Sequence, residues 1–249
     1  MFRIVPVLTI IEGNLVKTTA FKKPRYIGDP VNAVKIFNDK EVDEVILLDI
    51  GASKAGSGIS METLSEVVSE AFMPMAYGGA ITSVEDMRSI FFSGVEKVVI
   101  GSASRKLELV REAASLFGSQ SVVACLDFKK NRFASGYKMR SGRKFIRVDS
   151  VAEEVARVCD SGAGEVIISS TRRDGTLSGI DGELTAAVKH LSEVPLVYLG
   201  GASSEKDMRR IEELGFSGVG VGARFVYKGP RNAVLISYNN PFATSDLEY

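Results

Sequence analysis

Asp127 closes an apolar run, "SVVACLD" at residues 121–127, and the basic stretch "FKK" follows it. A short apolar run bounded by polar residues is typical of a buried strand. A carboxylate at the end of such a strand lies in a site that little water reaches, and there it can take up a proton and return it. The structural alternative is that Asp127 caps a helix or anchors a hairpin. Asp49, in "LLDI", and Asp174, in "RRDGT", have the same two possible roles. Each is either a carboxylate that takes part in the reaction or a residue that stabilises a turn through hydrogen bonds.

Thr9 occupies the corresponding position in a second run of the same rhythm, "RIVPVLT" at residues 3–9. An unperturbed threonine hydroxyl cannot act as an acid or base near neutral pH as a carboxylate can. The sequence therefore predicts one titratable group, Asp127, where two matched strand ends would allow a pair.

Two glycine pairs also follow apolar runs, in "YGGA" at residues 77–80 and in "LGGA" at residues 199–202. Without a Cβ, backbone N–H groups can approach a ligand closely, and a helix start a few residues later favours an anion. Small-residue turns in "IGSAS", "VGARF" and "RRDGTLSG" add to them, so we expect two phosphate cradles and a ligand phosphorylated at both ends. The alternative is that the glycines only allow tight turns. The first cradle would comprise Gly78, Gly79, Gly101 and Ser102, and the second Asp174, Gly175, Gly200, Gly201, Gly222 and Ala223.

Four charged residues, Arg3, Glu44, Lys97 and Glu165, each open an apolar run, and their charges sum to zero. They are either four solvated strand starts or a ring of charge at one end of a barrel. Side chains turned inward there would need mutual pairing, because an unpaired buried charge is strongly destabilising.

The elements that would position these residues are eight short β-rich runs that alternate with helical patterns, as in a (β/α)8 barrel. The helical patterns at 83–94 and 203–215 open on serine, carry an acidic residue two or three positions later and close on glycine, as capped helices do. Motifs such as "GGA" recur in the second half, so we expect one α/β domain over residues 1–249, a TIM barrel with a half-barrel two-fold repeat. The expected strands are 3–9, 44–50, 73–79, 97–102, 121–127, 165–170, 195–201 and 218–223.

Two longer segments interrupt this pattern after the first and fifth strands, at residues 10–29 and 128–148. The second alternates around "SG" and predicts a small hairpin. Both follow the C-terminal ends of strands, where barrels of this type build their active sites. The end of the chain, about 239–249, has the composition of a frayed tail.

The composition is that of a globular protein, with 249 residues, 45% of them apolar, and as many Lys and Arg as Asp and Glu. Zero formal net charge gives no indication of nucleic-acid or membrane-surface binding, and no apolar stretch approaches the ~18 residues that span a bilayer. The N-terminus lacks a signal-peptide cleavage site. Cys125 and Cys159 have neither disulfide-framework nor ligand spacing, and His190 is the only histidine. We therefore expect buried thiols in a reducing cytoplasm, with no metal and no cofactor.

Many of these segments together resemble one family, the cyclase subunit of imidazole glycerol phosphate synthase, a TIM barrel of histidine biosynthesis. The resemblance covers roughly residues 3–238 and rests on the order and spacing of many motifs, among them "RIVPVL", "LVKTTAF", "VDEVILLDI", "GVEKVVI", "FGSQSVVACLD" and "GAGEVIISSTRRDGT". It implies a lyase or cyclase subunit of a glutamine amidotransferase complex, which binds a phosphorylated small molecule at the top of the barrel.

The resemblance also implies a partner, a glutaminase subunit that docks on the bottom of the barrel. Ammonia would enter there through a gate of four charged residues and travel through the barrel to the top. Lys17 and Phe21 match a mobile loop after the first strand, and Gln120 falls on the glutaminase-facing side. The gate residues that the resemblance implies are Arg3, Glu44, Lys97 and Glu165.

The top face departs from the family pattern. The family uses two aspartates, at the ends of the first and fifth strands; Asp127 matches the second, and Thr9 replaces the first. Gly101 stands where the family has Asn, Ala223 stands where it has Ser, and Arg224 is a bulky addition to the second cradle. Ammonia delivery is therefore predicted to be intact, whereas the acceptor chemistry is predicted to differ.

This combination resembles a branch of the family that is encoded with surface-polysaccharide genes. There the barrel and its glutaminase supply ammonia for an acetamidino group on a nucleotide-activated or related sugar, and a separate sugar amidotransferase subunit completes the chemistry. We therefore expect an ammonia-conducting synthase subunit of lipopolysaccharide biosynthesis. The alternatives are an ordinary cyclase of histidine biosynthesis, in which Asp127 acts alone, and a non-catalytic scaffold that binds a phosphorylated ligand. The two-phosphate sugar isomerase of the same pathway fits less well, because Thr9 breaks its aspartate pair too.

Overall fold

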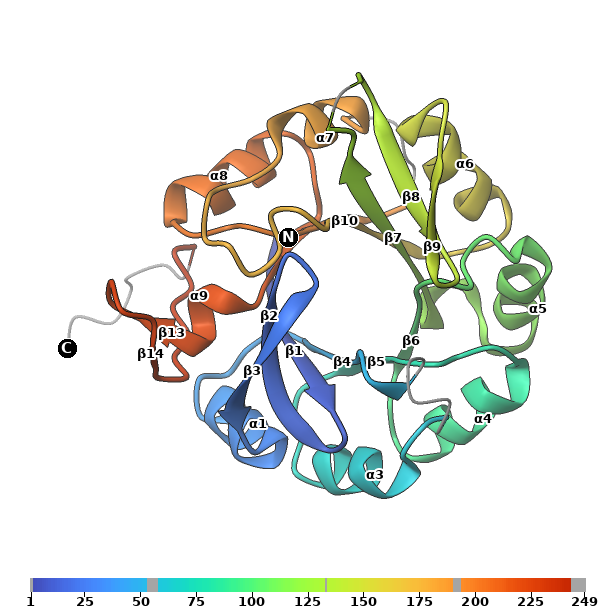
Figure 1. Ribbon diagram of the computed structural model, residues 1–249. Coiled ribbons are helices and arrows are strands. Elements are labelled where there is room, and N and C mark those ends of the chain that lie inside the picture. The colour runs from blue at the N-terminus through green and yellow to red at the C-terminus, as the bar shows by residue number, and fades with distance from the viewer. Residues whose placement is uncertain (1, 53–57, 133, 190–193, 243–249) are drawn as a thin grey trace.

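The computed structural model describes residues 2–52, 58–132, 134–189 and 194–242, and Figure 1 shows its helices arranged in a ring around the central strands. Each barrel strand pairs in parallel with the next, and β12 returns to pair with β1. The expected (β/α)8 barrel is thereby confirmed within the described residues. Its strands are β1 (Arg3–Ile11), β4 (Val45–Asp49), β5 (Met75–Gly78), β6 (Lys97–Ile100), β7 (Val122–Lys130), β10 (Glu165–Ser170), β11 (Leu196–Leu199) and β12 (Gly218–Val221).

The helices lie outside the strands and turn their apolar faces toward them. Most begin at a serine or aspartate whose side chain accepts a hydrogen bond from a backbone N–H of the first turn. A short 3-10 turn, η1 (Ser119–Ser121), precedes β7, and a small strand pair, β13 (Tyr227–Lys228) and β14 (Ala233–Val234), follows the last helix. The helices are α1 (Pro30–Asn38), α3 (Met61–Ser69), α4 (Val84–Phe92), α5 (Leu107–Phe117), α6 (Val151–Asp160), α7 (Gly182–Ala187), α8 (Glu205–Glu213) and α9 (Ala223–Val226).

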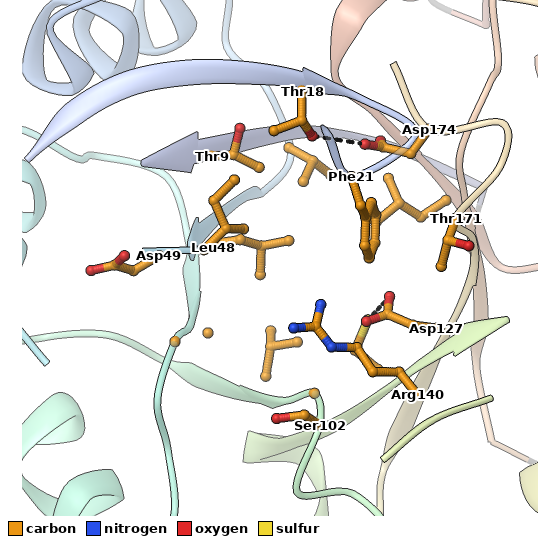
Figure 2. A pocket seen from close by; sticks show the side chains of 18 of the residues that line it. Thr9, Thr18, Phe21, Leu48, Asp49, Ser102, Asp127, Arg140, Thr171 and Asp174 are labelled. Atoms are coloured by element: carbon orange, nitrogen blue, oxygen red, sulfur yellow. Dashed lines mark hydrogen bonds between the residues drawn. The ribbon is translucent and has the colours of Figure 1, made fainter. Parts of the chain in front are cut away.

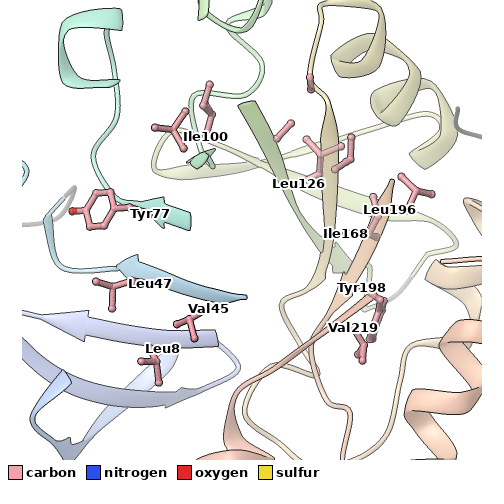
Figure 3. Packing of buried hydrophobic residues seen from close by; sticks show 14 of the residues in the cluster. Leu8, Val45, Leu47, Tyr77, Ile100, Leu126, Ile168, Leu196, Tyr198 and Val219 are labelled. Carbon is pink, nitrogen blue, oxygen red and sulfur yellow. The ribbon is translucent and has the colours of Figure 1, made fainter. Parts of the chain in front are cut away.

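Side chains along the barrel strands alternate between two apolar cores. In β1, Val5 and Val7 belong to the cluster inside the barrel, whereas Ile4 and Leu8 belong to the layer between strands and helices. Figure 3 shows part of this outer layer. Because the alternation has a period of two, Thr9 continues the inward row of β1 and reaches the open end of the barrel.

Two helix starts in opposite halves of the chain have the same hydrogen-bonded geometry. Ser83 and Asp86 form a capping box at α4, and Ser204 and Asp207 form one at α8. The residue before each serine also donates its N–H and its hydroxyl to the aspartate. The half-barrel repeat therefore extends to the capping of equivalent helices.

The two insertions are antiparallel ribbons that continue β1 and β7 beyond the barrel. β2 (Asn14–Thr19) pairs with β1 and with β3 (Lys22–Gly28). On the other side, β7 pairs with β8 (Tyr137–Ser141), which pairs with β9 (Lys144–Arg147). The small hairpin expected around "SG" is therefore confirmed as β8 and β9, and β7 pairs with β8 to make the second insertion a three-stranded ribbon.

The last described residues lie against the barrel. The Phe242 ring packs against Phe2 with centroids 5.1 Å apart, and Arg209 donates a hydrogen bond to the carbonyl of Pro241 at 2.8 Å. The expected fraying therefore does not hold for residues 239–242. The rest of that segment, 243–249, lies outside the described residues, as does His190.

Candidate active site

A cavity of about 760 Å³ opens at the C-terminal ends of the barrel strands, between the two ribbons. This volume falls in the usual range for small-molecule sites, and the face is the one the sequence predicted. Leu48 and Val99, from the barrel interior, border the cavity from below. Figure 2 shows Thr9, Asp49 and Asp127 around it, each on a different strand.

Asp127 lies half-buried in the pocket wall on β7, where it pairs in register with Ser169 of β10. Desolvation raises the pKa of its carboxyl group to about 6, although the Arg140 guanidinium acts in the opposite direction. A carboxyl group with a pKa this close to neutrality can both accept and donate a proton under physiological conditions. Of the three carboxylates in the pocket wall, Asp127 is the one suited to proton transfer.

The Thr9 hydroxyl is committed to a structural bond. Thr9 pairs in register with Val16 of β2, and its Oγ1 donates a hydrogen bond to the Val16 carbonyl oxygen. Thr9 lines the pocket but is buried. It therefore fastens the first ribbon to the barrel and offers the pocket no acid or base.

Asp49 also has a structural role in this geometry. Its Oδ1 accepts hydrogen bonds from the N–H groups of Gly51 and Ala52 at 3.0 and 2.9 Å. Desolvation raises the pKa of its carboxyl group, against the lowering effect of the two backbone hydrogen bonds. The side chain holds the turn after β4, as the turn alternative for Asp49 required.

Lys17 and Asp174 form a buried ion pair at 3.8 Å between the first ribbon and the turn after β10. Thr18 and Ala20 reinforce this contact, since Thr18 Oγ1 lies 3.5 Å from Asp174 and the Ala20 N–H donates to the Asp174 carbonyl at 2.8 Å. Asp174 therefore anchors the ribbon rather than standing free in the pocket.

Phe21 lies at the tip of the first ribbon and borders the pocket. Ala20 and Phe21 have φ angles of 50° and 62°, a left-handed conformation that side-chain-bearing residues adopt at some cost in free energy. The segment that contains Lys17 and Phe21 forms a hairpin with a strained turn at the edge of the pocket, and its mobility stays a prediction.

The first cradle forms part of the pocket wall. A Cβ on Gly78 would come within 2.9 Å of Val99, and one on Gly79 within 2.7 Å of the Asp49 side chain, so close packing alone requires glycine at both positions. At Gly101, by contrast, a Cβ would meet no atom within 4 Å. The turn at Gly101 is therefore the part of the first cradle that borders open space.

The second cradle is almost filled. Its residues border a separate cavity of about 10 Å³, which has room for roughly one water molecule. The Lys17 amine lies where a Cβ on Gly222 would be, and the Thr18 carbonyl lies where one on Gly175 would be. Arg224, expected to intrude here, borders neither of the two cavities; it belongs to α9, and Lys17 fills the space instead. The cradle residues that border the small cavity are Asp174, Gly175, Gly200, Gly201, Gly222 and Ala223.

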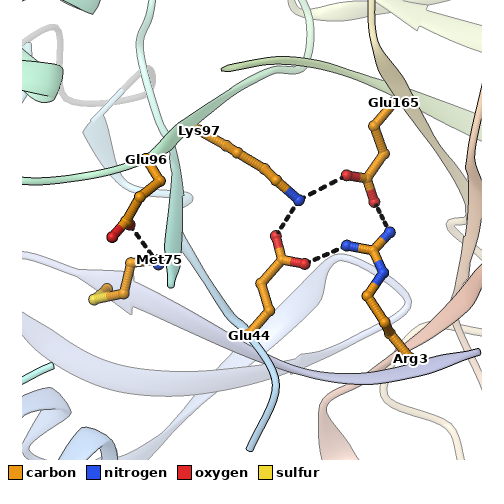
Figure 4. Close-up of polar contacts among 6 residues, drawn as sticks. All are labelled: Arg3, Glu44, Met75, Glu96, Lys97 and Glu165. Carbon is orange, nitrogen blue, oxygen red and sulfur yellow. Dashed lines mark hydrogen bonds and ion pairs between the residues drawn. The ribbon is translucent and has the colours of Figure 1, made fainter. Parts of the chain in front are cut away.

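At the opposite end of the barrel, four side chains form a closed charge ring, which we define as Arg3, Glu44, Lys97 and Glu165 (Figure 4). Arg3 donates to Glu44 at 2.5 Å and to Glu165 at 2.6 Å, and Lys97 donates to the same two carboxylates at 2.8 and 2.9 Å. Both glutamates are buried and contact two cations each. This alternation offsets their desolvation, so the geometry agrees with the ring and not with four separately solvated strand starts.

Exposed apolar side chains lie on the same end of the molecule, in the last turns of α4 and α5 and in the segment between α3 and β5. Phe72 is 86% exposed, Phe92 94% and Leu116 52%. Gln120, in η1, is also exposed there, just before β7 begins. Phe72 and Phe92 in particular leave large apolar surfaces uncovered, a feature typical of protein–protein interfaces.

Sequence reasoning did not single out Arg140, although it projects into the pocket beside Asp127 (Figure 2). The ribbon that carries it is held by a buried contact, in which the Tyr137 hydroxyl donates to Asp181 at 2.9 Å. The basic stretch "KMRSGRK" was the available signal, but only the fold shows which of its side chains turn inward.

The thiols differ from each other in burial. Cys125 is buried inside the barrel, and desolvation raises the pKa of its thiol, whereas Cys159 is only half-buried. The expectation of two buried thiols therefore holds for Cys125 alone. Among the described residues, no three His, Cys, Asp or Glu side chains are grouped so that they could hold a metal ion, and no helix is both long and apolar enough to cross a membrane.

Comparison with known proteins gives a consistent result. The family model described as "Histidine biosynthesis protein" matches residues 3–230. A Leptospira borgpetersenii protein named "Putative imidazole glycerol phosphate synthase subunit HisF" is 41% identical over 241 residues, which cover 96% of this chain and 95% of that one. A Pseudomonas aeruginosa protein, whose otherwise identical name ends in "hisF2", is 42% identical over 240 residues, 95% of each chain. The imidazole glycerol phosphate synthase subunit HisF of Clostridium botulinum is 38% identical over 210 residues, 82% of each chain.

Proposed function

Because the chain belongs to the histidine biosynthesis protein family, we propose that it is the ammonia-accepting, cyclase-type subunit of a complex similar to imidazole glycerol phosphate synthase. A glutaminase partner would dock on the end that carries the charge ring, and ammonia would pass through the barrel to the pocket. We further propose that the acceptor is not the histidine-pathway intermediate but a sugar that receives an acetamidino group in surface-polysaccharide biosynthesis, with a sugar amidotransferase as a further partner.

The observation that carries this proposal is the pairing of a complete charge ring with an incomplete set of acid and base groups. The ring has all four charges in alternating contact. At the other end, Asp127 has a pKa near neutrality, but Thr9 is bound to Val16. Delivery of ammonia requires the charge ring. The cyclase reaction of the family requires a second acid or base besides Asp127.

The barrel interior between the two ends supports passage of a neutral molecule. Its described side chains are apolar, with Val5, Ile46 and Ile167 just above the charge ring and Cys125 just below Asp127. Ammonia, which carries no charge, can cross such a region, whereas ammonium would lose its hydration there. The glutamates of the charge ring would collect ammonium at the entrance.

The exposed apolar side chains beside the charge ring support the partner. Phe72, Phe92 and Leu116 offer anchors of the kind that dominate binding energy at interfaces, and Gln120 adds a polar group next to them. A glutaminase seated on these residues would cover the charge ring and exclude water from the entrance.

The test is reconstitution with a candidate glutaminase subunit from the same organism. We expect a one-to-one complex at micromolar concentrations and an increase of glutaminase turnover when the two proteins are mixed. The absence of a complex in size-exclusion chromatography would contradict ammonia channelling and favour the scaffold alternative.

The alternative of an ordinary cyclase rests on one specific observation, the near-neutral pKa of Asp127. It predicts that the isolated chain converts the histidine-pathway intermediate into imidazole glycerol phosphate with a saturating ammonium salt, which bypasses the glutaminase. Loss of one partner of an acid–base pair typically slows a reaction by about 10²–10⁴-fold, so we expect negligible turnover. A rate within about tenfold of a typical enzyme's ~10 s⁻¹ would establish the cyclase alternative.

A further inference from the structure

The two phosphate cradles are not equivalent in this structure. The first borders the main pocket at Gly101 and Ser102, whereas the second contains the Lys17 amine and has room for about one water molecule. Lys17 is only 4% exposed and is paired with Asp174. A phosphate placed against Gly222 would displace this amine, which would leave the Asp174 carboxylate buried without it.

Two arginines of the second ribbon lie beside the first cradle. The Gly142 N–H donates a hydrogen bond to the Ser102 carbonyl at 3.2 Å, so the turn between β8 and β9 rests directly on that cradle. Arg140 and Arg143 flank this turn, and both border the pocket. Lys and Arg outnumber Asp and Glu among the lining residues, and all three carboxylates already accept hydrogen bonds from the protein.

This arrangement suits two neighbouring phosphates better than two distant ones. A planar guanidinium can bind two phosphate oxygens at once, and a diphosphate presents several within reach of one basic cluster. A ligand with phosphates at opposite ends would place one of them at the filled cradle. Phe145, on the same ribbon as these arginines, also borders the pocket; the Lys129 amine lies 5.1 Å from the centroid of its ring, so the other face of the ring is the one that a group attached to the phosphates would contact.

We propose that the pocket binds a ligand through a diphosphate group, held between the Gly101–Ser102 turn and the guanidinium groups of Arg140 and Arg143. The group attached to the diphosphate would extend along Phe145 or toward Asp127. This inference deepens the proposed function by naming the ligand class. It rests on the proposed function only for the statement that the bound ligand receives ammonia.

The experiment is calorimetric titration of the isolated full chain at constant ionic strength with four probes: inorganic phosphate, pyrophosphate, UDP and fructose 1,6-bisphosphate. We expect pyrophosphate and UDP to bind at least about tenfold more tightly than the other two, since charge-assisted contacts to adjacent phosphates add together. If UDP binds more tightly than pyrophosphate, the ligand is a nucleoside diphosphate. If UDP and pyrophosphate bind with equal affinity, the protein recognises the diphosphate group alone. Fructose 1,6-bisphosphate binding as tightly as pyrophosphate would overturn the inference.

Three variants make the test specific to the site. Arg140→Gln and Arg143→Gln should each weaken pyrophosphate binding by about tenfold, because each loses a charged donor to the phosphates. Arg147→Gln is the matched control, since Arg147 lies exposed on the same ribbon but does not border the pocket. Equal effects of all three would show only general attraction between charges and would overturn the inference. Because no glutaminase is present, the result is independent of whether the amidotransferase complex forms.

Discussion

Thr9 donates its hydroxyl hydrogen to the backbone carbonyl of Val16, and this bond joins the end of β1 to the ribbon that covers the pocket. The threonine at this strand end therefore has a structural role of its own. It supplies a donor that the ribbon uses, and the next residue along, Lys17, fills the second cradle. The bond from Thr9 and the contact of Lys17 with Gly222 therefore involve adjacent residues of the same strand, β2.

Replacing Thr9 with Asp is expected to restore little cyclase activity. An ionised carboxylate has no hydrogen to donate and would face the Val16 carbonyl oxygen, so the ribbon would shift or the fold would lose about 1–3 kcal/mol of stability. For a chain of this size that corresponds to a decrease of roughly 2–12 °C in melting temperature. Thermal unfolding and the ammonium-dependent cyclase assay measure the two effects.

Thr9→Ser is the control, because serine keeps the hydroxyl and should leave the melting temperature nearly unchanged. Full cyclase activity in Thr9→Asp, without loss of stability, would mean that the bond to Val16 is dispensable and that the missing carboxylate alone separates this chain from its relatives in histidine biosynthesis.

The charge ring is expected to be strongly coupled. Lys97→Met would leave Glu44 and Glu165 sharing Arg3 alone, and breaking such a pair within partly buried groups should lower the free energy of unfolding by about 1–3 kcal/mol. Adding Glu165→Gln restores the balance of one cation and one anion. We therefore expect the double variant to be more stable than the sum of the single effects predicts, by at least ~0.5 kcal/mol.

Denaturant unfolding of the two single variants and the double variant measures this coupling. Strict additivity would show that the four side chains are solvated independently and would remove the physical basis for a gate.

The order of helices and strands could be predicted from the sequence, because the short sequence patterns that favour each element agree with its place in the barrel. Ser83 was recognised as a helix start, and the second start was placed at Ser203, one residue before the observed N-cap Ser204, since capping depends on residues only three positions apart. The three-stranded form of the second ribbon was not recognised, because it depends on β7 extending past the barrel to Lys130. That extension is decided by pairing with β8, a contact that no local pattern specifies.

The site shows the same division. The inward direction of Asp127 follows from the period of its strand, and the charge ring follows from the charges at four strand starts. The closure of the second cradle by Lys17 could not be predicted, because it depends on how a hairpin folds over the turn at Asp174, which lies 156 residues after Thr18. Arg140 was overlooked for the same reason.

The exposed phenylalanines beside the charge ring should be anchors for the glutaminase. Phe72→Ser and Phe92→Ser are each expected to weaken the complex by at least about tenfold, since truncating a central aromatic anchor commonly costs 1–2 kcal/mol or more. The isolated chain should keep its melting temperature, because both rings are almost fully exposed.

Tyr26→Ser serves as the comparison, because Tyr26 is a 64% exposed aromatic on β3, at the opposite end of the barrel. Surface plasmon resonance with immobilised glutaminase gives the affinities. Equal losses for Tyr26→Ser and Phe92→Ser would place the partner elsewhere.

The raised pKa of Asp127 predicts a particular dependence of stability on pH. Desolvation raises this pKa from ~3.9 in the unfolded chain to about 6 in the folded one, so the folded state binds the proton more tightly. The stabilisation that this provides is present below pH ~4 and is lost as the pH rises through about 6. At pH 7 the ionised carboxylate therefore destabilises the fold, by roughly 1–3 kcal/mol once partial exposure is taken into account.

Asp127→Asn isolates this effect, because asparagine stays neutral and has almost the same shape. The difference in melting temperature between Asp127→Asn and the unchanged protein should be small at pH 4 and should grow to several degrees in favour of the variant by pH 7. Arg140→Met should shift the upper end of this transition above pH 6, since the Arg140 guanidinium lowers the pKa of Asp127 and its removal leaves desolvation unopposed. A difference that stays constant from pH 4 to pH 8 would mean that Asp127 titrates alike in the folded and unfolded chains, and Asp127 would then lose its standing as the proton-transfer group of the pocket.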